Sequence, residues 1–515
     1  MTSLRIYSIS LLILLLPGFG LAQQDSSIQR HTESFQLQYN RYAKDVITQP
    51  LLKNRNYGIV ELGYRAEEGE YMEAQAPQKQ NEIFFYTEGS KQIRKILVSG
   101  SFGWYNNQTD SQAFTLRQNY KDPVPYFYYA AQPGNWQTIR YRLQGIASVA
   151  LLNDKLTLGA GGTYNSFNAW RSNDPRPEEF NYELSGTALA HYRVLPKHTI
   201  GIAGGYIRKN YDNTWEYRND NNSTRPLLAV YIQNGYGNVE PMKGMLSGFI
   251  STNTTGYTAE GLYEGEFTFG TFTARGKYQK NNTEVFRKPV ARDELKQVFG
   301  TYKDDSYTVN VNWLKSNARN VFNIGFDYFD ELGKDQNERL AANNYIYAMQ
   351  QAKIYGLWSR LKDNRKMKYE IGASARLEDH LKMDGSVGQK AEYQSMDASI
   401  SGAYYFYFPS NNSTLKTGLK AGFRQPLHAE AVSVSQIFLF SQGVVYRDYY
   451  YFNASSASIG GNITYQFPVK KMYMFINAAA HYVSASIPAP VAGLIPYSYP
   501  GNNRMQWQCS IGLNL

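Results

Sequence analysis

The last eleven residues of the chain, Met505 to Leu515, constrain its fold more than any other stretch. Every second side chain is apolar or only weakly polar, and the side chains between them are polar or small; the first set is Met505, Trp507, Cys509, Ile511, Leu513 and Leu515. Strict alternation with a period of two predicts a β-strand with one apolar and one polar face. About ten residues is also the length that a tilted strand needs to cross a bilayer. The sequence therefore predicts a strand that faces lipid on one side.

The same alternation recurs throughout the chain and is clearest at residues 307–313, 322–328 and 367–377. A soluble β-sandwich also alternates, but it would have to bury the charges that lie inside many of these strands, and burying unpaired charges is costly. In a wide barrel the polar face lines water, so the charges stay solvated. We therefore predict an all-β protein, a transmembrane antiparallel β-barrel.

The connections between the alternating segments are short and long in turn, as in outer-membrane barrels, where the short turns are periplasmic and the long loops extracellular. Short turns are predicted at residues 87–92, 153–154, 194–198, 237–241, 270–271, 316–320, 362–366, 409–412 and 468–471. Long loops are predicted at residues 67–80, 105–135, 171–180, 211–225, 282–304, 332–343, 379–391, 426–450 and 485–503, with a brief one near 252–256. This pattern predicts about 20 strands, within a range of 16–22.

The first 22 residues have the features of a secretory signal peptide. Arg5 supplies the positive charge, residues 9–16 form a short apolar core, and small residues at 20–22 precede Gln23. The apolar core is too short for a membrane-spanning helix. The predicted organisation is a signal peptide at 1–22, an N-terminal segment at 23–55 that is either periplasmic or packed into the lumen, and the barrel at 56–515.

Composition agrees with a barrel. The 44 Tyr and 42 Gly far exceed average usage, and Tyr suits the interfaces of a membrane. The net charge of +10 is spread over scattered Lys and Arg, which favours a basic lumen or an anionic lipid surface as the partner and speaks against nucleic acid. Cys509 is the single cysteine, so no internal disulfide forms; on the apolar face it acts as a small hydrophobic residue.

Charged residues on the polar faces are the candidate site residues. A two-residue turn at Gly270 and Thr271 would set Glu266 opposite Arg275 and Glu264 opposite Lys277. We expect those four charges largely to cancel, and the basic residues elsewhere to attract anions if the lumen conducts. The full set of predicted lumen charges is Arg140, Arg142, Glu264, Glu266, Arg275, Lys277, Lys416, Lys420 and Arg424.

Three long loops are rich in aromatic residues, at 124–129, 214–218 and 445–452. One interpretation is that these rings form the upper interfacial girdle and pack against each other. The other is that they form a surface that stacks on sugars or other planar ligands. The sequence leaves both open.

The sequence does not predict an enzyme, a metal site or a cofactor. The His residues have no zinc or triad spacing; they are His31, His191, His198, His380, His428 and His481. Glu378, Asp379 and His380 match the rim residues of omptin-type outer-membrane proteases only in composition. His428 and Glu430 are placed to touch a metal from a loop, although a solvated loop explains them far better.

Three features resemble those of the uncharacterised outer-membrane β-barrel proteins of Bacteroidota. They are the Leu21-Ala22-Gln23 sequence at the end of the signal peptide, the Tyr-, Gly- and Asn-rich strands, and the terminal strand from Gln506 to Leu515. The resemblance implies outer-membrane lipid, lipopolysaccharide and the barrel assembly machinery as partners, and an accessory role beside a TonB-dependent uptake system. A TonB-dependent receptor itself would carry a large plug domain before the barrel, whereas here only residues 23–55 precede the first predicted strand.

These features lead to three functional hypotheses. The first is a channel or accessory protein in solute or nutrient uptake across the outer membrane. The alternative is a non-conducting surface protein that binds glycans or partner proteins through its aromatic loops. The third is a barrel-borne hydrolase.

Overall fold

The computed structural model describes residues 42, 45–52, 55–287, 297–363, 366–433 and 438–515. The predicted signal peptide, residues 1–22, lies outside the described residues, as does most of the segment 23–55.

No helix among the described residues is both long enough and apolar enough to cross a membrane.

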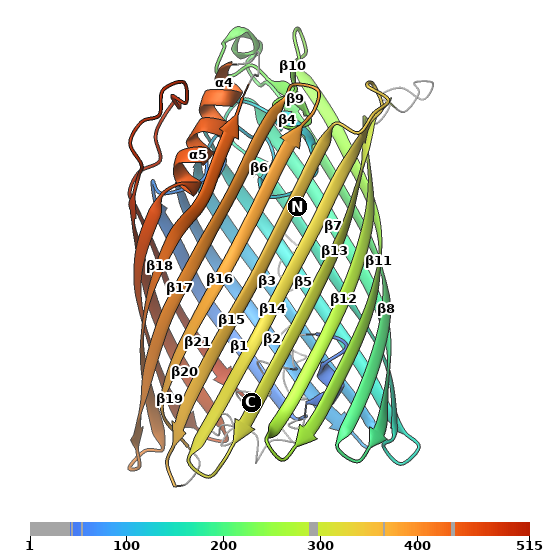
Figure 1. The fold of residues 1–515 in the computed structure, drawn as a ribbon, viewed down its shortest axis with the longest axis vertical. Helices are drawn as coiled ribbons and strands as arrows, with labels where there is room; N and C mark the ends of the chain where they lie inside the picture. The colour runs from blue at the N-terminus through green and yellow to red at the C-terminus, as the bar shows by residue number, and fades with distance from the viewer. Residues whose placement is uncertain (1–41, 43–44, 53–54, 288–296, 364–365, 434–437) are drawn as a thin grey trace, which may run out of the picture.

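The described residues form a closed, antiparallel barrel of 18 strands (Figure 1). Each strand pairs with its neighbours in chain order, and β1 pairs with β21 to close the ring. Closure leaves no unpaired strand edge facing lipid. The strands are β1 (Tyr57–Gly69), β2 (Lys79–Ile93), β3 (Ile96–Gln112), β5 (Gly134–Leu151), β6 (Leu156–Arg171), β7 (Arg176–Leu195), β8 (His198–Glu216), β11 (Ser247–Phe267), β12 (Gly270–Arg287), β13 (Gln297–Ser316), β14 (Asn320–Asn337), β15 (Tyr345–Leu361), β16 (Met367–Asp384), β17 (Gln389–Phe408), β18 (Ser413–Val432), β19 (Ser455–Val469), β20 (Met472–Ser486) and β21 (Asn503–Asn514).

The predicted fold is confirmed, and 18 strands fall within the predicted range of 16–22. Four predicted connections were wrong, those at 87–92, 237–241, 252–256 and 270–271. Residues 87–92 lie within β2, and the turn to β3 is at residues 94–95. The turn between β11 and β12 is at residues 268–269. Residues 252–256 are not a loop, because β11 runs through them without a break. The predicted turn at 237–241 does not join membrane strands: β9 (Tyr231–Asn234) and β10 (Val239–Pro241) form a separate small sheet with β4 (Tyr126–Tyr129). Strands of three or four residues are too short to cross a bilayer.

The outer face of the barrel is apolar. The side chains predicted to face lipid are exposed, among them Ile371 at 51%, Leu377 at 52% and Met505 at 48% of their full area. Cys509 is exposed on the same face. An apolar band of this extent around a closed barrel is the surface that lipid covers. The protein is thus an outer-membrane β-barrel whose many strands cross the membrane.

Three of the long loops fold back over and into one end of the barrel (Figure 1). We call residues 113–133, 217–246 and 438–454 the plug. It contains β4, β9 and β10, together with the 3-10 helix η3 (Asp220–Thr224), the short helix α4 (Phe438–Phe440), the π-helical turn η4 (Ser441–Val445) and α5 (Tyr446–Phe452).

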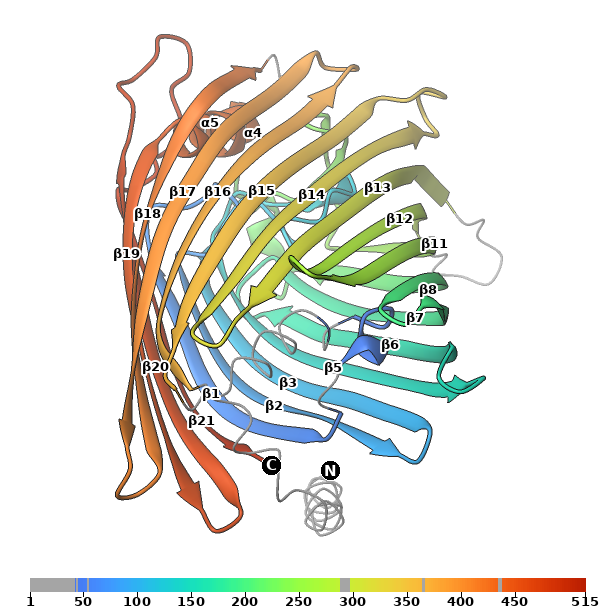
Figure 2. The ribbon, with the colours of Figure 1, turned by 60° about the horizontal axis from the view of Figure 1, so that its bottom comes forward.

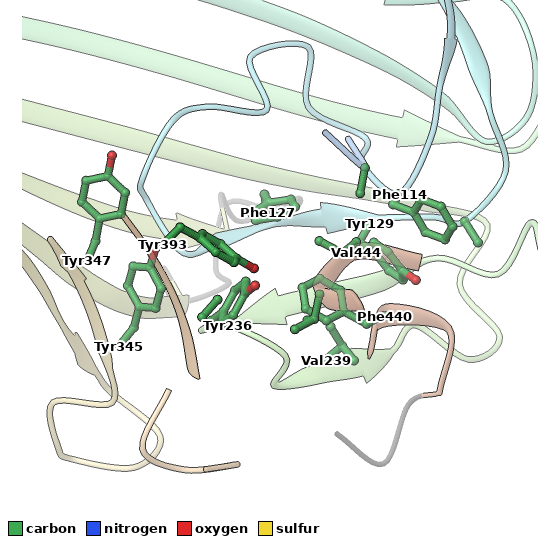
Figure 3. Close-up of a cluster of buried hydrophobic side chains, with 14 of the residues drawn as sticks. Phe114, Phe127, Tyr129, Tyr236, Val239, Tyr345, Tyr347, Tyr393, Phe440 and Val444 are labelled. Atoms are coloured by element: carbon green, nitrogen blue, oxygen red, sulfur yellow. The ribbon is translucent and has the colours of Figure 1, made fainter. Parts of the chain in front are cut away.

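The core of the plug is aromatic (Figure 3). Tyr129, Tyr236 and Phe440 meet there, with Tyr129 and Phe440 in an edge-to-face contact at 5.7 Å between ring centres. The barrel wall adds Tyr345 and Tyr393. Other rings of the three aromatic loops are equally buried: Tyr126, Phe127, Tyr128, Trp215, Tyr217 and Tyr450. These rings pack on each other and on the wall, as the first of the two interpretations expects, and do not present their faces to solution. The interfacial girdle stays a prediction.

Residues 45–52 lie inside the barrel near its short-turn end, and we call them the floor segment; its 3-10 helix is η2 (Gln49–Leu51) (Figure 2). Ile47 packs against wall residues Leu189, Ala203 and Leu262. Leu52 is fully buried against Tyr57 at the start of β1. The floor segment therefore occupies part of the lumen, opposite the plug.

Candidate functional site

A polar chamber lies in the lumen between the plug and the floor segment. Its volume is about 610 Å³, and its walls are inward-facing residues of β5 to β8 and β11 to β14. Residues 121–124 of the plug form its roof, and Asp45 and Val46 lie on its floor. A smaller cavity of about 280 Å³ shares Lys277, Asp304 and Glu331 with it, so the chamber extends along β12 to β14. The alternation along each strand places every second side chain in this space.

The roof is attached to the wall through Asp122. Lys209 of β8 approaches its carboxylate at 3.3 Å and Arg117 at 4.0 Å, and the backbone N–H of Val124 donates to it at 3.1 Å. Burial alone would raise the pKa of Asp122, but the charges of Lys209 and Arg117 outweigh burial and hold that pKa below its ordinary value. The carboxylate therefore stays ionised and fixes the plug loop over the chamber.

Further carboxylates hold the upper part of the plug. The hydroxyl of Tyr126 donates to Asp335 of β14 at 2.8 Å. The backbone N–H of Tyr236 donates to Asp384, the last residue of β16, at 2.7 Å. Asp448 of α5 accepts from the backbone N–H of Ala74 at 2.7 Å. Each contact pairs a buried donor with a strong acceptor, which fixes the loops in one arrangement.

The floor segment is attached to the wall through Arg275 of β12. Its guanidinium donates to Asp45 at 2.6 Å and to Glu260 of β11 at 2.8 and 3.1 Å. The hydroxyl of Tyr42 donates to Glu264 of β11. The β11–β12 hairpin thus holds both the ion pair of Asp45 and the hydrogen bond of Tyr42, which precedes the floor segment.

The predicted register of that hairpin was wrong. The turn residues are 268 and 269, so Gly270 begins β12 at φ +135°, a conformation that favours glycine, instead of forming the turn. As a result Glu266 lies opposite Thr271 and Glu264 opposite Thr273, not opposite Arg275 and Lys277. The predicted faces remain correct, because only an odd slip in register exchanges them.

The other predicted lumen charges do not gather at one place. Arg142 lines the chamber and donates to Asn165 at 3.3 Å, and Arg140 lies 6.0 Å from the ring centre of Phe167. Lys416 forms an ion pair with Glu370 at 2.6 Å, outside the chamber. The guanidinium of Arg424 lies 5.7 and 5.5 Å from the ring centres of Tyr451 and Phe452 in α5. Lys420, which lies between Lys416 and Arg424 on β18, is exposed. Their effect on ion selectivity stays a prediction.

Six residues that line the chamber were not among the predicted site residues: Asp45, Asp122, Lys209, Glu260, Asp304 and Glu331. The period-two pattern places the strand residues among them on polar faces, so this pattern carries a partial signal. Asp45 and Asp122 lie in irregular segments, and their place in the lumen depends on how the plug and the floor segment fold back.

The residues considered for catalysis and metal binding do not form a convergent site in the described part of the chain. His380 packs on the rings of Tyr347 and Phe452, whereas its neighbour Asp379 accepts from Gln394 on the other face of β16. Glu392, His428 and Glu430 lie within metal-ligand distance of one another. However, the ammonium of Lys390 already binds both carboxylates, at 2.7 and 2.8 Å.

No curated protein matches the sequence. Three solved structures with which the chain shares 7–9% identity are the siderophore receptor PiuA from Acinetobacter baumannii, the copper transporter OprC and the RagAB peptide transporter. Their TM-scores are 0.37, 0.42 and 0.41. The alignments cover 88%, 89% and 90% of this chain and 82%, 80% and 87% of those chains. Residues 47–515 match the model of a family of unknown function, DUF6850, and because this match covers most of the chain, the protein belongs to that family.

Proposed function

We propose that the protein is a gated uptake barrel of the outer membrane. A small polar solute enters the chamber past the plug and leaves toward the periplasm when the floor segment moves. The observation that carries this proposal is the position of the chamber, a polar space between two segments of the chain that each fill part of the lumen. We further propose that it works beside a TonB-dependent uptake system, as the resemblance of the sequence implies.

A permanently open pore fits less well. A barrel of 18 strands is wide enough for an aqueous channel unless something fills it. Here the aromatic core of the plug fills one end, and the apolar contacts of Ile47 and Leu52 hold the floor segment at the other. Passage of a solute therefore requires the plug and the floor segment to move. The contacts that have to break are the ion pairs of Asp122 with Lys209 and of Arg275 with Asp45.

The alternative of a non-conducting surface binder is less well supported. It depends on aromatic rings presented to solution, whereas Tyr128, Tyr129 and Trp215 are each 1% exposed or less. It also gives no role to the charges that line the chamber.

Labelling of a single cysteine tests access to the chamber. In a Cys509→Ser background, Thr187→Cys places a thiol on the chamber wall and Ala489→Cys places one on an exposed extracellular loop. We expect a small cationic thiosulfonate added to intact cells to label Ala489→Cys quickly and Thr187→Cys slowly but completely. A Thr187→Cys thiol that reacts only after unfolding would overturn the proposal.

Conductance in planar bilayers tests the floor segment as the gate. We expect little conductance from the unmodified protein and more from Asp45→Asn, which loses the ion pair with Arg275. Asp363→Asn makes the same chemical change at a fully exposed turn and serves as the matched control. Equal conductance of the two variants would show that the floor segment is not the gate.

A further inference from the structure

Two opposite charges face the chamber without a partner. Lys277 of β12 and Glu331 of β14 are half-buried and line both cavities, and neither makes an ion pair or a hydrogen bond with any described residue. The other charged residues of the chamber all have a polar partner. Arg142, Glu183 and Asp304 form hydrogen bonds with neutral side chains. Arg275 binds Asp45 and Glu260, and Lys209 binds Asp122. Unpaired charges of opposite sign in one chamber are groups that a ligand can satisfy.

We propose that the chamber binds a short linear zwitterion, namely a peptide of about three or four residues with free termini. The carboxylate of the peptide pairs with Lys277, and its ammonium group pairs with Glu331. This inference rests on the proposed function, to which it adds the chemical class of the solute.

The spacing of the two strand positions that carry these side chains sets the approximate length of the ligand. Lys277 lies opposite Thr308 of β13, and Thr308 lies opposite Phe329 of β14, two residues from Glu331. With strands about 4.8 Å apart and about 3.3 Å per residue along them, the two backbone positions are roughly 12 Å apart. An extended peptide spans about 3.3–3.6 Å per residue. Three or four residues therefore match this spacing, whereas a single amino acid is too short to bridge it.

The groups between the two charges suit a peptide backbone. Gln279, Asn281, Ser306 and Thr308 line this part of the chamber and offer both donors and acceptors. Asp304 adds negative charge beside Glu331; one of its oxygens accepts from Asn281 at 2.7 Å. The acidic end thus lies on β13 and β14 and the basic end on β12.

Other classes of small solute satisfy the chamber less completely. A neutral sugar leaves both charges unpaired, and a simple anion or cation satisfies only one of them. The cavity volume of about 610 Å³ lies within the usual range for small-molecule sites.

Calorimetry with four probes on the full chain in detergent tests the ligand class. The probes are tri-alanine, N-acetyl-tri-alanine, tri-alanine amide and maltotriose. We expect tri-alanine to bind most tightly, each capped form about tenfold more weakly because it lacks one charged contact, and maltotriose not to bind. Maltotriose binding as tightly as tri-alanine would overturn the proposal.

Two variants assign the ends of the peptide. We expect Lys277→Gln to bind tri-alanine and its amide equally while still discriminating against the acetylated form. Glu331→Gln should show the reverse pattern. Lys416→Gln removes a charge that is paired with Glu370 outside the chamber and should bind like the unmodified protein. Heat-modifiable migration on gels confirms that each variant is folded. Unchanged tri-alanine binding by folded Lys277→Gln and Glu331→Gln would contradict the assignment.

The two proposals fail separately. If the thiol of Thr187→Cys is labelled from outside but tri-alanine does not bind, the ligand class is wrong and the uptake function stands. If tri-alanine binds with the expected pattern in detergent but the thiol is never labelled in cells, the site exists and the transport function is wrong.

Discussion

Arg275 connects three segments of the chain through one guanidinium. Its side chain is 14% exposed, and it shares its donors between Asp45 of the floor segment and Glu260 of the wall, whose side chain is 9% exposed. Only arginine has the rigid fork that serves two carboxylates in this way. The residue therefore links the stability of the wall hairpin to the position of the floor.

Arg275→Gln should destabilise the folded barrel by about 3 kcal/mol, because it leaves the nearly buried carboxylate of Glu260 without its cation. Adding Glu260→Gln removes that unpaired charge, so the double variant should recover part of the loss. Urea unfolding in detergent measures both effects. Purely additive losses from the two substitutions would show that the two side chains do not depend on each other.

The plug is held largely by carboxylates, and Asp448 is a carboxylate of the plug itself whose ionisation changes near neutral pH. Burial, followed by the charge of Glu73, raises the pKa of Asp448 from 3.8 to about 7. Lys382 and Arg447 partly offset this shift because they favour the ionised form. In the docked plug the carboxyl group of Asp448 therefore binds a proton more tightly than the same group does in water.

The sign of the pH effect follows from this raised pKa. In the docked state α5 is packed in the plug, and in the undocked state Asp448 is exposed to water. Between pH 3.8 and about 7 the docked state holds more protons at Asp448 than the undocked state. Docking therefore weakens as the pH rises through this window and is constant above it. We expect hydrogen exchange of residues 441–452, corrected for intrinsic rates, to show more protection at pH 5 than at pH 8. Asp448→Asn should remove most of this difference, whereas Asp220→Asn, at an exposed plug position, should leave it unchanged. Equal protection at both pH values in the unmodified protein would contradict the prediction.

At the scale of the whole molecule, β21 completes the barrel by pairing with β20 on one side and with β1 on the other. Deletion of Met505 to Leu515 would remove nearly all of β21 and leave two strand edges in lipid, where unpaired backbone groups cannot be satisfied. We expect the truncated protein to lose heat-modifiable migration and to accumulate in the periplasm. Normal insertion of the truncated protein would contradict this.

Features that depend on residues within one strand could be predicted from the sequence, whereas features that depend on contacts between distant segments could not. Period-two alternation depends on one strand at a time, so it predicted the lipid-facing set of β21 and the barrel correctly. It failed for β9 and β10, where short stretches with apolar residues resemble membrane strands but belong to the plug. It also misplaced the β11–β12 turn by two residues, since more than one position near Gly270 keeps the same faces. The chamber depends on contacts such as Asp45 with Arg275, for which alternation carries no information.

The pairing of β1 with β21 also has a kinetic consequence. Contacts such as Arg65 with Gln508 join residues 443 positions apart, whereas most other strand pairs are neighbours in the chain. Hairpins of neighbouring strands form early because little chain entropy opposes them, but contacts of such long sequence separation form late. Until they form, β1 presents an edge that is able to pair with any other exposed strand. The pairing of β1 with β21 therefore sets how long the barrel remains an open sheet and how long that sheet is exposed to aggregation.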